Sequence, residues 1–202
     1  SYKAVVFDFG GVLMSYDDSV AEWKEWETTF GLPCGSIQKT LFSVLTDVPG
    51  IDRMLFEGRV TGEDLEDDFL PTFFSHRLGV SFPRPFPVLS KWQGSGAKIR
   101  YNDEMLRVVK RLRQLGYYTV ILTNNFKIDR AGKLERTRID RDLFDFIVES
   151  TVEGVMKPNL DIYKITQSRL PHHITPEQCI FLDDIRVNCS AAETFGWKSI
   201  LV

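Results

Sequence analysis

The sequence predicts an α/β fold, a doubly wound parallel sheet into which a small all-helical domain is inserted after the first strand. Five short runs are apolar throughout rather than alternating, which is typical of strands buried on both faces of a parallel sheet. Helical patterns separate the last four of these runs, and such alternation favours a doubly wound sheet. The runs lie at residues 4–7, 118–123, 146–149, 179–182 and 199–202.

The first strand leads directly into a polar turn. In the segment AVVFDFGGVLM, residues 4–14, four apolar residues precede Asp8, and Gly10 and Gly11 then turn the chain. In open parallel sheets, ligands bind beyond the carboxyl ends of the strands. Asp8 is therefore a candidate site residue, and its alternative is a cap of the following turn.

The stretch between the first two strands predicts a separate helical domain. Amphipathic helical patterns fill it, and no segment in it has the pattern of a strand. A proline-rich run at residues 82–87 and a Gly/Ser-rich run at residues 93–96 follow these patterns. We expect residues 15–97 to form a helical cap, and residues 1–14 and 98–202 to form the core. The helical patterns cover residues 20–30, 37–45, 51–56 and 65–74.

Helices with recognisable ends connect the later strands of the core. Residues 102–116 have apolar positions at helical spacing and stop at a glycine. Residues 158–170 begin with a proline, a favourable first residue of a helix. Residues 187–196 end at a second glycine. The segment TPEQ at residues 175–178 predicts a cap just before the fourth strand.

Composition and charge exclude several classes of function. The 202 residues are 43% hydrophobic and 26% charged, and their net charge of −3 comes without a basic stripe. This length supports one sizeable core, and we expect no nucleic-acid partner. We expect no membrane association, because no apolar run approaches the roughly 20 residues of a membrane span. The three cysteines are widely spaced, so we expect reduced thiols in a reducing compartment such as the cytoplasm.

Side chains that can carry chemistry follow four of the predicted strands. Taken singly, each has an ordinary explanation as a helix cap, a turn residue or a solvated lysine. Together they converge on one edge of one sheet, which favours a functional site. They are Asp8 after the first strand, Thr123 and Asn124 after the second, Lys157 after the third, and Asp183 and Asp184 after the fourth.

This set of residues favours phosphoryl transfer with a bound cation. Three carboxylates at one edge repel one another, and burial raises that cost. A divalent cation relieves the repulsion, and all-oxygen ligands with room for water suit Mg²⁺. The carboxylate can then attack, while the cation, the lysine and the hydroxyl hold the phosphoryl oxygens. We therefore expect Mg²⁺ as the cofactor and a small phosphorylated substrate.

In order and spacing, these motifs resemble those of the haloacid dehalogenase-like hydrolase superfamily. The matching segments are FDFGGVLM, EGRVT, LTNNF, EGVMKPNLDIY and IFLDDIRVN, which are spread over residues 7–188. The resemblance implies a Rossmann-like core with a small helical cap after the first strand. Most members of the superfamily are phosphatases, so it also implies Mg²⁺-dependent hydrolysis through an aspartyl-phosphate.

The resemblance further implies a role for each matching residue. Asp8 would be the nucleophile and a magnesium ligand. The backbone carbonyl of Gly10 and the carboxylate of Asp184 would be the other protein ligands. Asp183 would lie in the outer shell or share this role, and Asn188 would support the acidic loop unless it is an ordinary solvated helix residue. For the phosphoryl group, the implied binding residues are Thr123, Asn124 and Lys157.

One position departs from the pattern of the superfamily. Its phosphatases usually carry an aspartate two residues after the nucleophile, where this chain has Gly10. That aspartate protonates the leaving alkoxide and then activates the water that hydrolyses the aspartyl-phosphate. Glycine cannot transfer a proton, and general acid-base catalysis contributes about 10²–10⁴-fold. Slow catalysis, rescue by another acid and no catalysis are all compatible with this residue.

Three hypotheses follow. The leading one is a magnesium-dependent phosphatase that acts on a small phosphomonoester. The alternative is a catalytically weak or inactive haloacid dehalogenase-like module of a larger acyl-CoA-related protein, with other domains of a longer chain as partners. A metal-free dehalogenase comes third, because the chain keeps both Asp183 and Asp184.

Overall fold

A computed structural model describes residues 1–16, 21–93, 99–134 and 137–202 of the chain. It divides the chain into two compact units. The core unit comprises Ser1–Ser15, Ile99–Asn125 and Thr137–Val202, and the cap unit comprises Tyr16–Lys98 and Phe126–Arg136. Residues 94–98, which include the expected end of the cap at residue 97 and most of the Gly/Ser-rich run, lie outside the described residues. The second segment of the cap unit has no counterpart in the sequence-based division.

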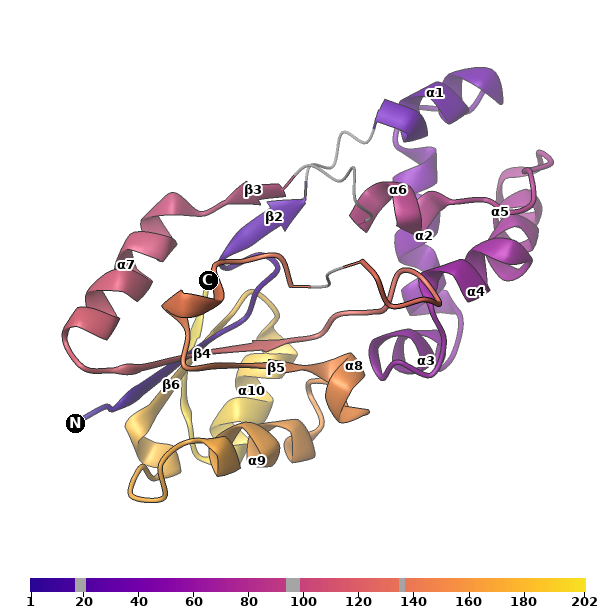
Figure 1. Cartoon of the computed structure of the whole chain (residues 1–202). Coiled ribbons are helices and arrows are strands. Elements are labelled where there is room, and N and C mark those ends of the chain that lie inside the picture. The colour runs from indigo at the N-terminus through magenta and orange to yellow at the C-terminus, as the bar shows by residue number, and fades with distance from the viewer. Residues whose placement is uncertain (17–20, 94–98, 135–136) are drawn as a thin grey trace. The chain divides into compact units, whose positions relative to one another are not determined.

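A five-stranded sheet forms the centre of the core unit, with the strand order β5-β4-β1-β6-β7 (Figure 1). Every neighbouring pair in it is parallel. The predicted parallel sheet is therefore confirmed, with each strand within one residue of its expected bounds. The strands are β1 (Ala4–Phe7), β4 (Tyr118–Thr123), β5 (Phe146–Glu149), β6 (Cys179–Asp183) and β7 (Lys198–Leu201).

The central strand β1 brings Asp8 between two other strand ends. All four of its residues are buried, as expected for an inner parallel strand. Phe7 pairs with Ile121 of β4 and with Leu182 of β6. The backbone N–H of Asp8 still donates to the Leu182 carbonyl, at 2.8 Å. The ladder thus holds Asp8 at the carboxyl edge of the sheet.

Helices cover both faces of the sheet, with α7 on one face and α9 and α10 on the other (Figure 1). This is the doubly wound arrangement that the sequence predicts. Helix α9 begins at Leu160 rather than at the expected Pro158, because the Asn159 side chain accepts the backbone N–H of Asp161 and acts as the N-cap. The helices of the core unit are α7 (Asp103–Gln114), η1 (Arg141–Leu143), α8 (Ser150–Glu153), α9 (Leu160–Arg169), η2 (Pro176–Gln178) and α10 (Arg186–Phe195).

Two short strands, β2 (Met14–Tyr16) and β3 (Ile99–Tyr101), form a second sheet. They lie at the two ends of the stretch for which the sequence predicts only helices, so that expectation is wrong at its margins. A strand of three residues is too short for its apolar pattern to be distinguished from that of a loop.

The cap unit is helical between these strands. The pattern at residues 65–74 is divided between two helices, because Asp68 leaves the helical conformation with φ −141°. Helix α6 follows the proline-rich run and was not expected. None of the described helices has both the length and the apolar character needed to cross a membrane. The helices are α1 (Ala21–Thr29), α2 (Ser36–Asp47), α3 (Ile51–Phe56), α4 (Gly62–Asp67), α5 (Phe69–Leu78) and α6 (Val88–Gln93).

Candidate active site

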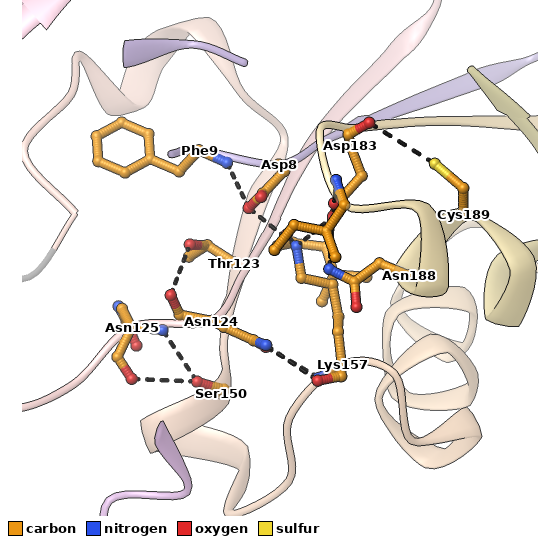
Figure 2. Close-up of polar contacts among 12 residues, drawn as sticks. Asp8, Phe9, Thr123, Asn124, Asn125, Ser150, Lys157, Asp183, Asn188 and Cys189 are labelled. Atoms are coloured by element: carbon orange, nitrogen blue, oxygen red, sulfur yellow. Dashed lines mark hydrogen bonds and ion pairs between the residues drawn. The ribbon is translucent and has the colours of Figure 1, made fainter. Parts of the chain in front are cut away.

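Asp8 is held in place by two donors at the end of β1 (Figure 2). The backbone N–H of Phe9 donates to its Oδ1 atom at 2.7 Å, and the Lys157 Nζ atom lies 2.9 Å from the same oxygen. Asp8 is 7% exposed. A buried carboxylate with charge-assisted contacts is held in one orientation.

The two glycines that follow have different structural roles. Gly11 has φ +79°, and a Cβ atom built there would lie 2.2 Å from Oδ2 of Asp184. Glycine is therefore required at position 11 by both conformation and close approach. Gly10 does not have a positive φ, and a Cβ atom at this position would meet no described atom within 4 Å. The backbone at position 10 can accept a side chain.

Lys157 connects the carboxylates of two strands. Its Nζ atom lies 2.9 Å from Asp8 and donates to Oδ2 of Asp183 at 2.7 Å and to the Leu122 carbonyl at 3.0 Å. Burial alone would lower its pKa, but the charges of Asp8 and Asp183 outweigh this effect and raise it. The lysine therefore stays positively charged in its buried position.

The acidic pair after β6 divides into one buried and one exposed carboxylate. Asp183 is fully buried and accepts hydrogen bonds from the Ile185 backbone at 2.7 Å and from Nδ2 of Asn188 at 3.1 and 3.2 Å. Asp184 is exposed. Asp183 is thus saturated by protein donors, whereas the Asp184 carboxylate remains accessible. Asn188 lies where it can orient the acidic loop.

The donor set fits a divalent cation. One carboxylate oxygen from each of Asp8, Asp183 and Asp184 lies within 4.8 Å of the others. Burial raises the pKa of Asp8 to about 6; the Lys157 charge opposes this effect and the Asp183 charge adds to it. Burial and the Asp183 charge also raise the pKa of Asp184. Excess negative charge and all-oxygen donors are the conditions that Mg²⁺ satisfies.

The turn after β4 supplies a hydroxyl and an amide. The Thr123 hydroxyl donates to the Asn124 carbonyl at 3.5 Å, the outer limit for a hydrogen bond, so it can exchange this contact for a better acceptor. The side chain of Asn124 donates to the Lys157 carbonyl at 3.0 Å and accepts the Lys157 backbone N–H at 2.9 Å. Any phosphoryl contact from Asn124 would therefore use its backbone N–H.

A buried network behind this turn was missed by the sequence reasoning. The Asn125 backbone N–H donates to the Ser150 hydroxyl at 3.0 Å, and its Nδ2 atom donates to Glu149 at 2.7 Å and to Thr137 at 3.2 Å. The Thr151 hydroxyl donates to Oδ1 of Asn125 at 2.9 Å. The network holds the turn after β4 against the end of β5. A second asparagine after the strand was the available signal.

The raised pKa of Asp8 predicts how stability depends on pH. The folded protein binds a proton at Asp8 with a pKa of about 6, against an ordinary value of 3.8. The contribution of this carboxyl to stability is complete below about pH 4 and is lost as the pH rises through about 6. In metal-free protein, Asp8→Asn should therefore raise the free energy of unfolding at about pH 8, by at most about 3 kcal/mol.

Thermal unfolding of both proteins between pH 4 and pH 8 measures this difference. Lys157 keeps Asp183 as a partner in the variant, so its charge remains compensated. The stabilisation should disappear toward pH 4. A variant that is equally stabilised at both ends of the range would contradict the assignment to the Asp8 carboxyl.

Comparisons with known proteins find relatives that match the whole chain. Over 215 residues, the chain is 29% identical to acyl-CoA dehydrogenase family member 10 of Mus musculus, a match that covers 100% of the chain and 18% of the relative. The chain thus spans less than a fifth of that protein. It is 26% identical over 208 residues to phosphatase MT3486 of Mycobacterium tuberculosis (strain CDC 1551 / Oshkosh), covering 100% of the chain and 88% of the relative.

A solved structure shares the fold. The HAD family enzyme BT-2542 of Bacteroides thetaiotaomicron, in complex with magnesium and inorganic phosphate, aligns with a TM-score of 0.67 and 20% identity. The alignment covers 100% of this chain and 94% of that one. A family model described as haloacid dehalogenase-like hydrolase matches residues 2–196. The expected family is confirmed, and the chain belongs to the haloacid dehalogenase-like hydrolases.

Proposed function

We propose that the site hydrolyses a small phosphomonoester, with Asp8 as the nucleophile and Asp8, Asp184 and the Gly10 carbonyl as ligands of Mg²⁺. The observation that carries the proposal is the position of Lys157, whose Nζ atom lies 2.9 Å from Oδ1 of Asp8. Asp8 is also one of three clustered carboxylates. A relative named as a phosphatase and a fold neighbour solved with magnesium and phosphate support it.

The first step transfers the phosphoryl group to the protein. A carboxylate oxygen of Asp8 forms a bond to phosphorus, and the bond from phosphorus to the ester oxygen breaks. Lys157 and the Thr123 hydroxyl hold the phosphoryl oxygens as charge moves onto the leaving group. When bound, Mg²⁺ supplies positive charge that offsets the carboxylates and the phosphoryl group.

The second step frees Asp8. A water oxygen bonds to phosphorus, the bond between phosphorus and Asp8 breaks, and inorganic phosphate leaves. This water must lose a proton, and in the first step the departing alkoxide must gain one. Gly10 can do neither, so both transfers fall to solvent. Attack by Asp8 therefore remains efficient. The departure of poor leaving groups and the hydrolysis of the aspartyl-phosphate become slow.

One observation favours a second candidate, a weakly active or inactive module. The space beside Gly10 contains no described atom that could replace a side chain in proton transfer within 4 Å of the Cβ position. In that case the site would retain Mg²⁺ and phosphate binding without turnover.

A magnesium titration of aryl-phosphate hydrolysis tests the proposal. Aryl phosphates depart with little protonation, so the parent protein should hydrolyse them in a Mg²⁺-dependent manner. At about 100 times the dissociation constant, Mg²⁺ should stabilise the parent by about 2.7 kcal/mol. Asp184→Ala should remove both the activity and the thermal shift.

The matched control is Asp161→Ala, which removes an exposed carboxylate paired with Lys164 on α9. It should behave like the parent. If Asp184→Ala responds to Mg²⁺ as the parent does, the metal site is misassigned. If the parent and Asp161→Ala both bind Mg²⁺ and the parent releases no product, the second candidate is favoured.

A further inference from the structure

A segment of the cap unit starts directly after the proposed phosphate-binding turn. We call residues 126–134 the strap. Strand β4 ends at Thr123, the turn continues through Asn124 and Asn125, and Phe126 begins the strap. The strap is thus covalently continuous with the proposed phosphate-binding turn, but it belongs to the cap unit rather than to the core unit.

The base of the strap is fixed in the core unit. Nδ2 of Asn125 donates to Oγ1 of Thr137 at 3.2 Å, and Oε1 of Glu149 accepts from both residues, at 2.7 Å in each case. The chain therefore leaves and re-enters the core unit at neighbouring points. A displacement of the strap would act directly on Asn125, whose backbone N–H is bonded to Ser150.

The strap also completes a helix of the cap unit. The first N–H groups of any helix have no partner inside that helix. In α4, the Gly62 N–H donates to the Lys127 carbonyl at 2.8 Å and the Glu63 N–H to the Ile128 carbonyl at 2.9 Å. The strap and α4 run side by side at this point (Figure 1). The N-terminus of α4 thus depends on the position of the strap.

Two residues secure this contact. A Cβ atom at Gly62 would lie 3.1 Å from the Ile128 carbonyl oxygen, so glycine permits the close approach. Arg130 donates from its backbone N–H to Glu63 at 2.9 Å, from Nε to Asp64 at 2.6 Å, and from a terminal nitrogen to Asp67. The strap is therefore hydrogen-bonded to four of the six residues of α4.

Apolar side chains of the strap belong to the core of the cap unit. Phe126 and Ile128 are each 3% exposed and lie in one cluster with residues of α2 to α6. The Phe126 ring meets the Phe56 ring edge-on, with centroids 6.0 Å apart. Pulling the strap away from the cap unit would expose both side chains. It is therefore built into the cap unit rather than lying loosely on it.

We propose that the strap makes the cap unit a positioning element for the phosphate-binding turn, with Arg130 and Gly62 as positioning residues. Anchoring of residues 126–130 on α4 restricts Asn125, and through it Asn124 and Thr123. Because such coupling is reciprocal, phosphate bound at the turn stabilises the strap and α4. The effect of bound phosphate on the strap rests on the proposed function, whereas the restriction of Asn125 by the strap does not.

Amide hydrogen exchange measured by NMR tests the coupling without any need for activity. The variants are Arg130→Met and, as a stronger perturbation, Gly62→Val. The matched control is Arg77→Met, which removes an exposed cap arginine paired with Asp47 at 3.1 Å, away from the strap. In phosphate-free protein, exchange of the Asn125 amide should accelerate about 2- to 30-fold in Arg130→Met and remain unchanged in the control.

A double-mutant cycle identifies the responsible contact. If Arg130 acts through its pair with Asp67, then Arg130→Met and Asp67→Asn should be less than additive in their effect on Asn125 exchange. Faster exchange confined to α4, with Asn125 unchanged in both Arg130→Met and Gly62→Val, would overturn the proposal, because the strap would then be a local support of the cap unit alone.

Inorganic phosphate with Mg²⁺ tests the reciprocal statement. Adding both to the parent should slow exchange of the Gly62 and Glu63 amides, and Arg130→Met should weaken phosphate binding about 2- to 30-fold with Mg²⁺ affinity unchanged. If phosphate does not bind, and exchange of the Asn125 amide still depends on Arg130, the proposed function is wrong and the positioning role of the strap is supported. If phosphate binds with no effect on α4, the reciprocal coupling is wrong.

Discussion

Replacing Asp8 with asparagine is expected to lower the single-turnover rate of aryl-phosphate cleavage by about 10⁴–10⁶-fold, the range found when single members of a catalytic triad are removed. The amide keeps the size of the side chain but cannot form the acyl-phosphate bond. The Phe9 N–H and Lys157, which lie 2.7 and 2.9 Å from Asp8, would still orient it. Single-turnover release of nitrophenolate measures the effect.

The control for this variant is its own stability. Asp8→Asn should unfold at a higher temperature than the metal-free parent at pH 8, so loss of activity cannot be ascribed to loss of fold. Lys157→Met is a poorer choice, because it leaves two buried carboxylates, Asp8 and Asp183, without their cation. Turnover by Asp8→Asn within tenfold of the parent would show that another group attacks phosphorus.

Gly10→Asp is expected to speed the hydrolysis of alkyl phosphates by up to about 10²–10⁴-fold, the usual contribution of general acid-base catalysis. The position has no positive φ, and a Cβ atom there meets no described atom within 4 Å, so the side chain can be accommodated. In the first step, measured as single-turnover release of the leaving group, the gain for aryl phosphates should be much smaller, because their leaving groups need little protonation. The ratio of the two rates in parent and variant is the measurement.

Gly11→Ala provides the matched comparison. It adds a smaller side chain one residue further on, but at φ +79° and 2.2 Å from Oδ2 of Asp184. This variant should lose Mg²⁺ binding and gain no activity. Equal first-step rates of the parent for alkyl and aryl phosphates, together with no gain in Gly10→Asp, would mean that a different residue supplies the proton.

The sheet and the members of the site could be predicted because both depend on local signals. Strands buried on both faces are apolar throughout, and parallel strands bring their carboxyl ends to one edge. Asp8, Thr123 and Asp183, which lie at or directly after strand ends, therefore had to approach one another once the strands were identified. Their distances and partners could not be predicted, since they depend on side-chain packing.

The remaining features depend on contacts that are distant in the sequence. Nothing near Phe126 indicates that it packs in a cluster with residues of α2 to α6. The sequence predicts Asn124 as a phosphate ligand, but in the structure its side chain is hydrogen-bonded to the backbone of Lys157, 33 residues away. Helix α6 begins directly after a proline-rich run, where local pattern favours a loop.

The most direct test of the central claim, efficient attack by Asp8 followed by slow release, is a rapid-mixing experiment with excess nitrophenyl phosphate and Mg²⁺. The parent should release a burst of nitrophenolate close to one equivalent and then turn over slowly, and the peptide that contains Asp8 should carry a phosphoryl group during the slow phase. Gly10→Asp should lose the burst as release accelerates, and Asp8→Asn should show none. Steady turnover by the parent with no burst and no phosphorylated protein, or no release at all with Mg²⁺ bound, would contradict the claim.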